Sequence, residues 1–196
     1  MFIQTESTPN PHSLKFLPGQ TVLANAAADY PTPESAESSP LAREIFTAEG
    51  VRRVYLADDF VTVTKDEAAD WAHLKPAILA AIMDYFLSNP ASAEAGAANA
   101  AAVADDGADQ DIVYEGEAAD IVDQIKELIE TRVRPAVARD GGDIRFHSWR
   151  HDEGLVRLVM RGSCAGCPSS TATLKSGIEN MLKHYVPEVN SVEAVI

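Results

Sequence analysis

The two cysteines of this chain stand three positions apart, in a stretch that reads RGSCAGCPSST from Arg161 to Thr171. Cys164 and Cys167 form a C-x-x-C motif with a glycine between them and a proline directly after it. A strand-like apolar pattern leads into the motif and a helical pattern follows it. Thiolates are stabilised near the N-terminus of a helix. We therefore expect two partly exposed thiols that ionise readily.

Three kinds of chemistry are open to such a motif. One is thiol–disulfide exchange, in which the first thiolate attacks and the second resolves. The others are a structural zinc ion and an iron–sulfur cluster, both of which usually take four protein ligands. One chain supplies two sulfurs, so either metal site needs two further ligands.

Histidines or a second copy of the chain could complete a metal site. The histidines have no short, fixed spacing to the cysteines, so each is expected to be an ordinary surface or packed residue. Two copies that each contribute Cys164 and Cys167 would give four thiolates about a two-fold axis. The histidines in question are His12, His73, His147, His151 and His184.

The context of the motif bears on these alternatives. A thiol–disulfide oxidoreductase typically carries its C-x-x-C in a βαβ unit, whereas this motif follows a predicted antiparallel hairpin. A thiol–disulfide oxidoreductase and a zinc-bridged structural dimer both remain alternatives. Arg161 precedes the motif, and we expect it to be solvated at the end of a strand rather than to face the site.

The overall composition excludes several functions. A net charge of −14 argues against general nucleic-acid binding and against docking on anionic lipid. No apolar run approaches the roughly 20 residues of a membrane span, and no catalytic constellation is present, so we expect neither a membrane protein nor an enzyme. No presequence precedes Phe2, and two cysteines suit a reducing compartment. These features predict a cytoplasmic, bacterial protein.

The charge is unevenly distributed along the chain. Residues 1–90 carry a net charge of −6 and residues 118–196 a net charge of −1, whereas residues 91–117 carry seven acids and no base. Residues 91–112 consist almost entirely of alanine, glycine and acids, which cannot bury a core. We therefore expect two small α+β domains, residues 1–90 and 117–196, joined by a flexible acidic linker at 91–116.

Local patterns predict four strands and two helices in the first domain. Two short strands are followed by a long loop, a helix, a hairpin and a second helix. Ser39 and Pro40 have the pattern of a helix start, and Pro76 is expected to begin or kink the second helix. In chain order, the predicted elements are strands 2–6 and 13–17, loop 19–38, helix 41–48, hairpin 51–65 and a helix from 71 to 89.

The second domain is predicted to have the order α-β-β-α-β. An apolar helical stripe runs from Ile121 to Val137, and Pro135 should disturb its last turn. Asp140-Gly141-Gly142-Asp143 is a strong helix stop. The remaining predicted elements are strands 144–150 and 155–161, a helix at 171–185 and a strand at 192–196.

Both domains resemble parts of one known family. Residues 117–196 look like the NifU C-terminal, or Nfu, domain of iron–sulfur cluster scaffold and carrier proteins. Residues 1–88 resemble the N-terminal Nfu domain. The matching segments are RPAVARDGGDI, RGSCAGCPSS and TATLKSGIENML in the second domain, and FIQTESTPNPHSLKFLPG and GVRRVYLADDFVTVTK in the first.

The resemblance implies a function. Members of the family assemble or carry a [4Fe-4S] cluster, which the C-x-x-C motifs bridge between two protomers, and they pass it to apo-proteins. Cys164 and Cys167 would then be the cluster ligands, in a homodimer that forms when the cluster is loaded. Upstream assembly machinery would be the donor, and apo iron–sulfur proteins the recipients. The N-terminal domain would recognise partners and carry no metal.

Overall fold

A computed structural model describes residues 2–24, 26–89, 112, 114–165 and 168–195 of the chain. The chain divides into two compact units, Met1–Asp105 and Asp106–Ile196, here called the N-terminal and C-terminal units. Each unit has a sheet and a hydrophobic core of its own. Most of the predicted linker lies outside the described residues.

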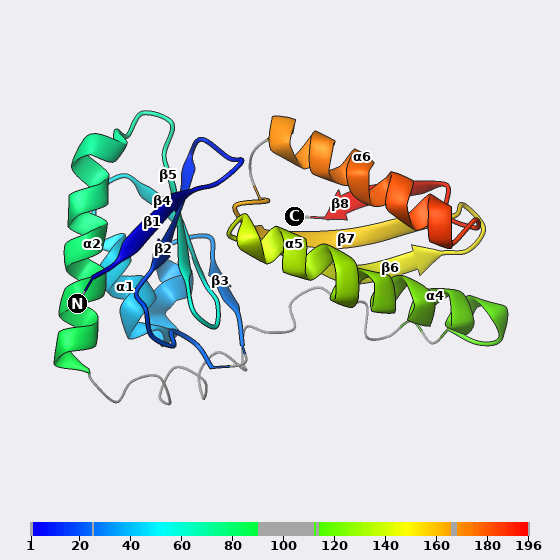
Figure 1. Ribbon diagram of the computed structural model, residues 1–196, viewed down its shortest axis with the longest axis horizontal. Coiled ribbons are helices and arrows are strands. Elements are labelled where there is room, and N and C mark those ends of the chain that lie inside the picture. Colours follow the sequence, from blue (N-terminus) through cyan, green and yellow to red (C-terminus); the bar gives the residue numbers. More distant parts are fainter. Residues whose placement is uncertain (1, 25, 90–111, 113, 166–167, 196) are drawn as a thin grey trace. The chain divides into compact units, whose positions relative to one another are not determined.

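The N-terminal unit contains a five-stranded antiparallel sheet with the strand order β1-β2-β5-β4-β3 (Figure 1). The predicted hairpin forms its centre, because β4 and β5 pair directly. The strands are β1 (Gln4–Ser7), β2 (Ser13–Leu17), β3 (Ala28–Tyr30), β4 (Val51–Leu56) and β5 (Val61–Lys65).

The prediction of four strands is wrong, because β3 lies within the segment that was expected to be a loop. This strand has only three residues, which is too short for an alternating pattern to show. Its pairing with β4, with Asp29 opposite Tyr55, defines it as a strand. A short 3₁₀ helix, η1 (Glu34–Ser38), follows in the same segment.

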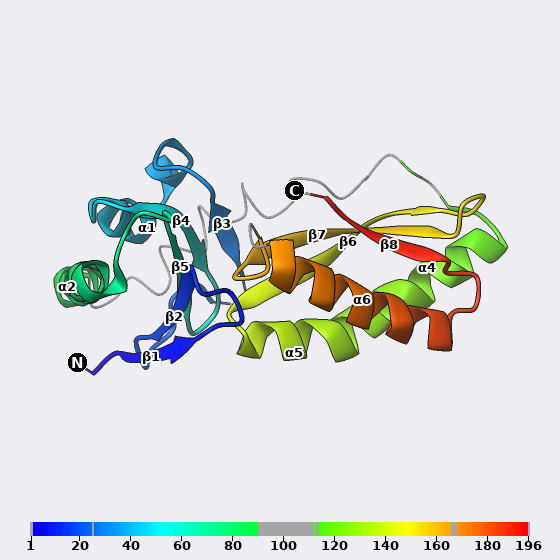
Figure 2. The same cartoon turned by 90° about the horizontal axis from the view of Figure 1, so that it is seen from above.

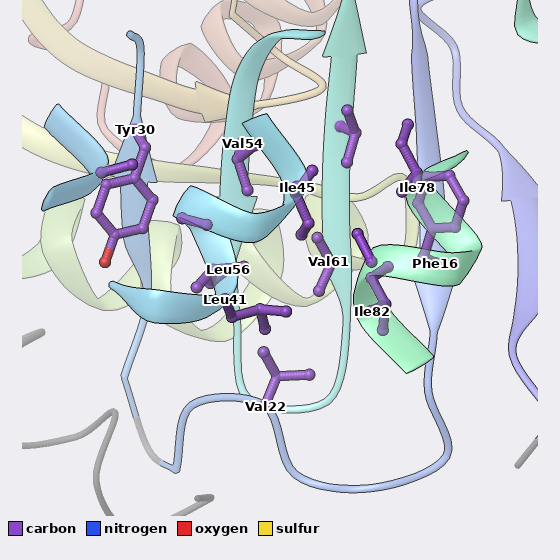
Figure 3. Close-up of a cluster of buried hydrophobic side chains, with 14 of the residues drawn as sticks. Phe16, Val22, Tyr30, Leu41, Ile45, Val54, Leu56, Val61, Ile78 and Ile82 are labelled. Carbon is purple, nitrogen blue, oxygen red and sulfur yellow. The ribbon is translucent and has the colours of Figure 1, made fainter. Parts of the chain in front are cut away.

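Two helices supply the other half of this core (Figure 3). Helix α1 (Pro40–Phe46) begins as predicted, because the Ser39 side chain accepts a hydrogen bond of 3.2 Å from the backbone N–H of Ala42. Helix α2 (Trp71–Ser88) is capped by Asp70, so Pro76 lies inside the helix and does not begin it. Ile45 of α1 and Ile78 and Ile82 of α2 belong to the same buried cluster as the sheet residues Phe16, Val54 and Val61.

The C-terminal unit contains a three-stranded sheet in the order β6-β7-β8. Strands β6 and β7 form an antiparallel hairpin, and β8 pairs parallel to β7. Helices α4, α5 and α6 lie on one face of this sheet (Figure 2). The elements are α4 (Glu117–Leu128), α5 (Arg134–Arg139), β6 (Gly142–Arg150), β7 (Leu155–Gly162), α6 (Pro168–Tyr185) and β8 (Ser191–Val195).

The first helix of this unit is interrupted in the middle. Between α4 and α5, residues Ile129–Val133 form the π-helical segment η2. Pro135 follows directly in the first turn of α5. Proline lacks a backbone N–H and its ring clashes with the carbonyl four residues earlier. A local π-helical turn is one way for a helix to accommodate such a residue, so the predicted disturbance lies just before the proline.

The α-β-β-α-β order of the C-terminal unit and the α+β class of both units are confirmed. Among the described residues, no helix has the length and apolar character needed to cross a membrane.

We predict that the Ile78→Ala substitution destabilises the N-terminal unit by about 2–5 kcal/mol, because it opens a cavity beneath the sheet. Ile78 is fully buried, whereas Leu87 on the same helix is 67% exposed. Leu87→Ala is therefore a matched control that should cost less than about 0.5 kcal/mol. Hydrogen exchange in increasing urea would give the stability of each unit, and equal losses for the two variants would contradict the core described here.

Candidate functional site

The C-x-x-C motif lies between the end of β7 at Gly162 and the start of α6 at Pro168. This agrees with the predicted strand–loop–helix arrangement. Cys164 belongs to the described part of the loop, whereas Gly166 and Cys167 lie outside the described residues. The geometry of the site is therefore that of Cys164 and its surroundings.

Cys164 is buried, so the expectation of an exposed thiol is wrong for this residue. Its side chain belongs to the hydrophobic core of the C-terminal unit, and it is 6% exposed. Ile144 of β6 and Met160 of β7 are members of the same core. The chain after β7 therefore turns the first cysteine of the motif inward.

The expectation of a readily ionised thiol also fails for Cys164. Burial raises the pKa of this thiol to about 11, because desolvation disfavours the thiolate. The nearby charges of Asp140 and Asp143 raise the pKa further, and a hydrogen bond with Ser163 lowers it only in part. At neutral pH the metal-free protein therefore holds Cys164 as a neutral thiol.

A turn at the end of α5 holds the first half of the loop. The backbone N–H of Ser163 donates a hydrogen bond of 3.2 Å to the carbonyl of Gly141. The Ser163 hydroxyl donates a second, of 2.6 Å, to the carbonyl of Asp140. Gly141 has φ +77°, a conformation that side chains disfavour. The loop is thus fixed to the turn by two hydrogen bonds.

Gly142 makes room for the sulfur of Cys164. A Cβ atom built on Gly142 would overlap that sulfur and would crowd the Ser163 hydroxyl and the Arg161 carbonyl, both at 3.1 Å. Sequence reasoning treated Gly141 and Gly142 only as a helix stop and missed this role, as it missed Ser163. One glycine is enough to end a helix, so the second of two adjacent glycines was the sequence signal that could have indicated a close contact at Gly142.

Asp143 anchors this turn to the rest of the unit. Its carboxylate accepts hydrogen bonds from Arg134 of α5 at 2.8 Å, Arg145 of β6 at 3.3 Å and the backbone N–H of Ile144 at 2.9 Å. Arg134 also contacts Glu130 at 2.6 Å. Because the bond from Arg134 joins α5 to β6, it fixes the segment that runs between the two elements.

Arg161 and the histidines were also considered from the sequence as parts of the site. Arg161 is 7% exposed, so its expected solvation is wrong. The histidines of the C-terminal unit have other neighbours: Ser148 Oγ for His147, Trp149 for His151 and Tyr185 for His184. Among the described residues, no three or more histidine, cysteine or acidic side chains gather as a metal site would require.

We predict slow labelling of the Cys164 thiol in the folded, metal-free protein. With Cys167 changed to serine, a maleimide should react with Cys164 at pH 8 roughly 100-fold more slowly than in urea, because the thiol is buried and its pKa is raised. Raising the pH toward 11 should accelerate labelling of the native protein, since the thiolate then forms. Labelling at the same rate with and without urea would contradict the burial of this sulfur.

Curated proteins resemble this chain over nearly its whole length. NifU-like protein 4, mitochondrial, of Arabidopsis thaliana is 50% identical over 98% of the chain. The NFU1 iron-sulfur cluster scaffold homologs, mitochondrial, of Drosophila willistoni and Homo sapiens are 49% and 48% identical over 100% of it. The chain spans 65%, 64% and 72% of the length of these three relatives.

These relatives overturn the prediction of a cytoplasmic, bacterial protein, because all three are named as mitochondrial. The prediction assumed that a sequence starting just before Phe2 has no presequence, and it also relied on the small number of cysteines. The point at which a sequence begins does not identify a cellular compartment. A chain with two cysteines is compatible with more than one compartment.

Family models cover both units. Residues 3–89 match the model described as scaffold protein Nfu/NifU N terminal, and residues 125–193 match the NifU-like domain. The second match contains β6, β7, the C-x-x-C loop and α6. With a human relative that is 48% identical and of which the chain covers 72%, these matches show that the chain belongs to the Nfu/NifU family.

Proposed function

We propose that this chain is a scaffold and carrier whose cargo is a [4Fe-4S] cluster, held by Cys164 and Cys167 from two copies of the chain. The observation that carries the proposal is the pair of Nfu domains on a chain with only two cysteines, both in the NifU-like domain. Relatives with which the chain aligns along its length are named iron–sulfur cluster scaffold homologs.

The number of ligands supports the sharing of the cargo between two chains. A [4Fe-4S] cluster takes four thiolates, and one chain has two. A two-fold axis through the site supplies all four from identical loops.

The surroundings of the motif suit an anionic cargo. Helix α6 begins at Pro168, directly after Cys167, and the N-terminal end of a helix stabilises negative charge. Cys164 starts as a neutral buried thiol, so it must lose its proton and leave the core to become a ligand. Loading therefore releases protons and opens the loop.

A shared site also suits delivery. Each chain holds half of the ligands, so separation of the two copies leaves the cargo with only two thiolates. Thiolates of an apo iron–sulfur protein can then replace Cys164 and Cys167 in turn. We propose such apo-proteins as recipients, upstream assembly machinery as the donor, and a role in transfer rather than in catalysis.

The alternative of thiol–disulfide exchange is less well supported. An attacking cysteine in such enzymes has a lowered pKa and an accessible sulfur, whereas Cys164 has a raised pKa and is buried. A zinc-bridged dimer would use the same four sulfurs, and the metal bound on reconstitution decides between zinc and the cluster.

We predict that anaerobic reconstitution with iron and sulfide gives a brown protein with about two iron atoms per chain, and that loading converts monomers to dimers in sedimentation. Cys164→Ser should abolish both changes, because each dimer then keeps two of its four thiolates. Ser176→Ala, a change at an exposed position of α6, should load as the wild type does.

A colourless protein that binds only zinc, with Cys164→Ser no worse than the wild type, would refute the cluster. Loaded protein that stays monomeric would refute the shared site.

We propose that residues 1–90 recognise recipients, in line with the match to the N-terminal Nfu model. Both cysteines lie outside this segment, so its deletion should leave cluster loading unchanged. Transfer of the cluster to some recipients should slow, which can be measured as the rate at which an apo-dehydratase regains activity. Equal transfer rates to every recipient tested would count against a recognition role.

A further inference from the structure

The Asp140–Gly142 turn holds the start of the C-x-x-C loop in a position that buries the Cys164 sulfur. Binding of a ligand by that sulfur does not require this burial. The same turn bonds the backbone of the loop and leaves the space in which the sulfur of Cys164 lies. Both effects favour the inward position of the Cys164 side chain. As a ligand in the proposed shared site, this side chain would have to face outward.

We propose that Asp140, Gly142 and Ser163 form a latch that stores the Cys164 sulfur inside the core of the C-terminal unit until cargo is loaded. These three are positioning residues, since they act through Cys164. The inference rests on the proposed function, and it adds a closed state of the site and the residues that maintain it.

Gly142 is the steric part of the latch. Any side chain at this position would occupy the place of the Cys164 sulfur, because even a Cβ atom overlaps it. The φ of Gly142 is not among the positive values found in this chain, so alanine is compatible with its backbone. Gly142→Ala therefore acts mainly by displacing the sulfur.

Ser163 is the hydrogen-bonding part of the latch. Its hydroxyl reaches the Asp140 carbonyl at 2.6 Å and lies 4.0 Å from the Cys164 sulfur. The Ser163 side chain thus bridges the turn and the residue that precedes the sulfur. Removal of the hydroxyl breaks this bridge and leaves the backbone hydrogen bond to Gly141 in place.

The ion pair that attaches α5 to β6 does not involve the latch residues. The Asp143 carboxylate, paired with Arg134 of α5, fixes α5 to β6 independently of the Ser163 hydroxyl. The loop can therefore open at Ser163 while the turn itself stays attached. A shared site needs this freedom, because a sulfur in the core of one chain cannot reach a metal that a second chain also binds.

The test compares Ser163→Ala and Gly142→Ala with the wild type, all as full chains. Labelling of Cys164 by a maleimide is measured with Cys167 changed to serine and should be about tenfold faster in each variant. Ser163→Ala loses one buried hydrogen bond, and Gly142→Ala fills the space in which the Cys164 sulfur lies. With Cys167 present, anaerobic loading with iron and sulfide should also be faster, with the final amount of cluster unchanged.

Two substitutions serve as matched controls. Ser148→Ala removes another buried serine hydroxyl, whose partner is His147, and Gly177→Ala adds a Cβ atom where no other atom lies within 4 Å. Both should label and load at the wild-type rate. Thermal unfolding of every variant separates opening of the latch from a general loss of stability.

Wild-type labelling rates in both latch variants would overturn the proposal. The proposal would also be overturned if the two controls labelled faster as well and the labelling rates of all variants simply followed their lowered melting temperatures. Faster labelling of the latch variants without faster cluster loading would overturn it too. If even the wild type takes up no cluster, the proposed function fails, and the labelling rates still decide whether the sulfur is stored.

Discussion

The packing of the Cys164 sulfur against Gly142 is the constraint on which the site depends. The sulfur lies in a space that exists only because residue 142 has no side chain. Burial in that space raises the thiol pKa to about 11, which keeps the group neutral and unreactive. The hydrogen bonds of Ser163 to the Asp140–Gly141 turn hold the backbone in the position in which this packing occurs.

A protein that carries a reactive cargo benefits from such an arrangement. An exposed thiolate in the metal-free state would be open to oxidation, whereas a buried thiol is protected. In the proposed function, the cost is that loading must displace the Cys164 sulfur from an apolar environment. In the proposed shared site, the free energy of four new metal–thiolate bonds is available to open two loops.

Local patterns were sufficient to predict most of the fold. Alternation identified the β4–β5 hairpin, Ser39 and Pro40 marked the start of α1, and the apolar stripe before Asp140 identified the helix that carries Pro135. The short strand β3 was missed because it is defined by its pairing with β4. The burial of Arg161 was missed for a similar reason, since the end of a strand gives no local sign of what packs against it.

The sequence by itself determined that the motif has two sulfurs, that a helix follows it and that the chain forms two α+β units. These features depend on residue identity and short-range spacing. Only the tertiary structure decided which way Cys164 faces. That direction depends on a contact between residues 22 positions apart, Gly142 and Cys164, which no local pattern records. The helix-dipole argument predicted an ionised thiol, and desolvation, a property of the packed core, outweighed it.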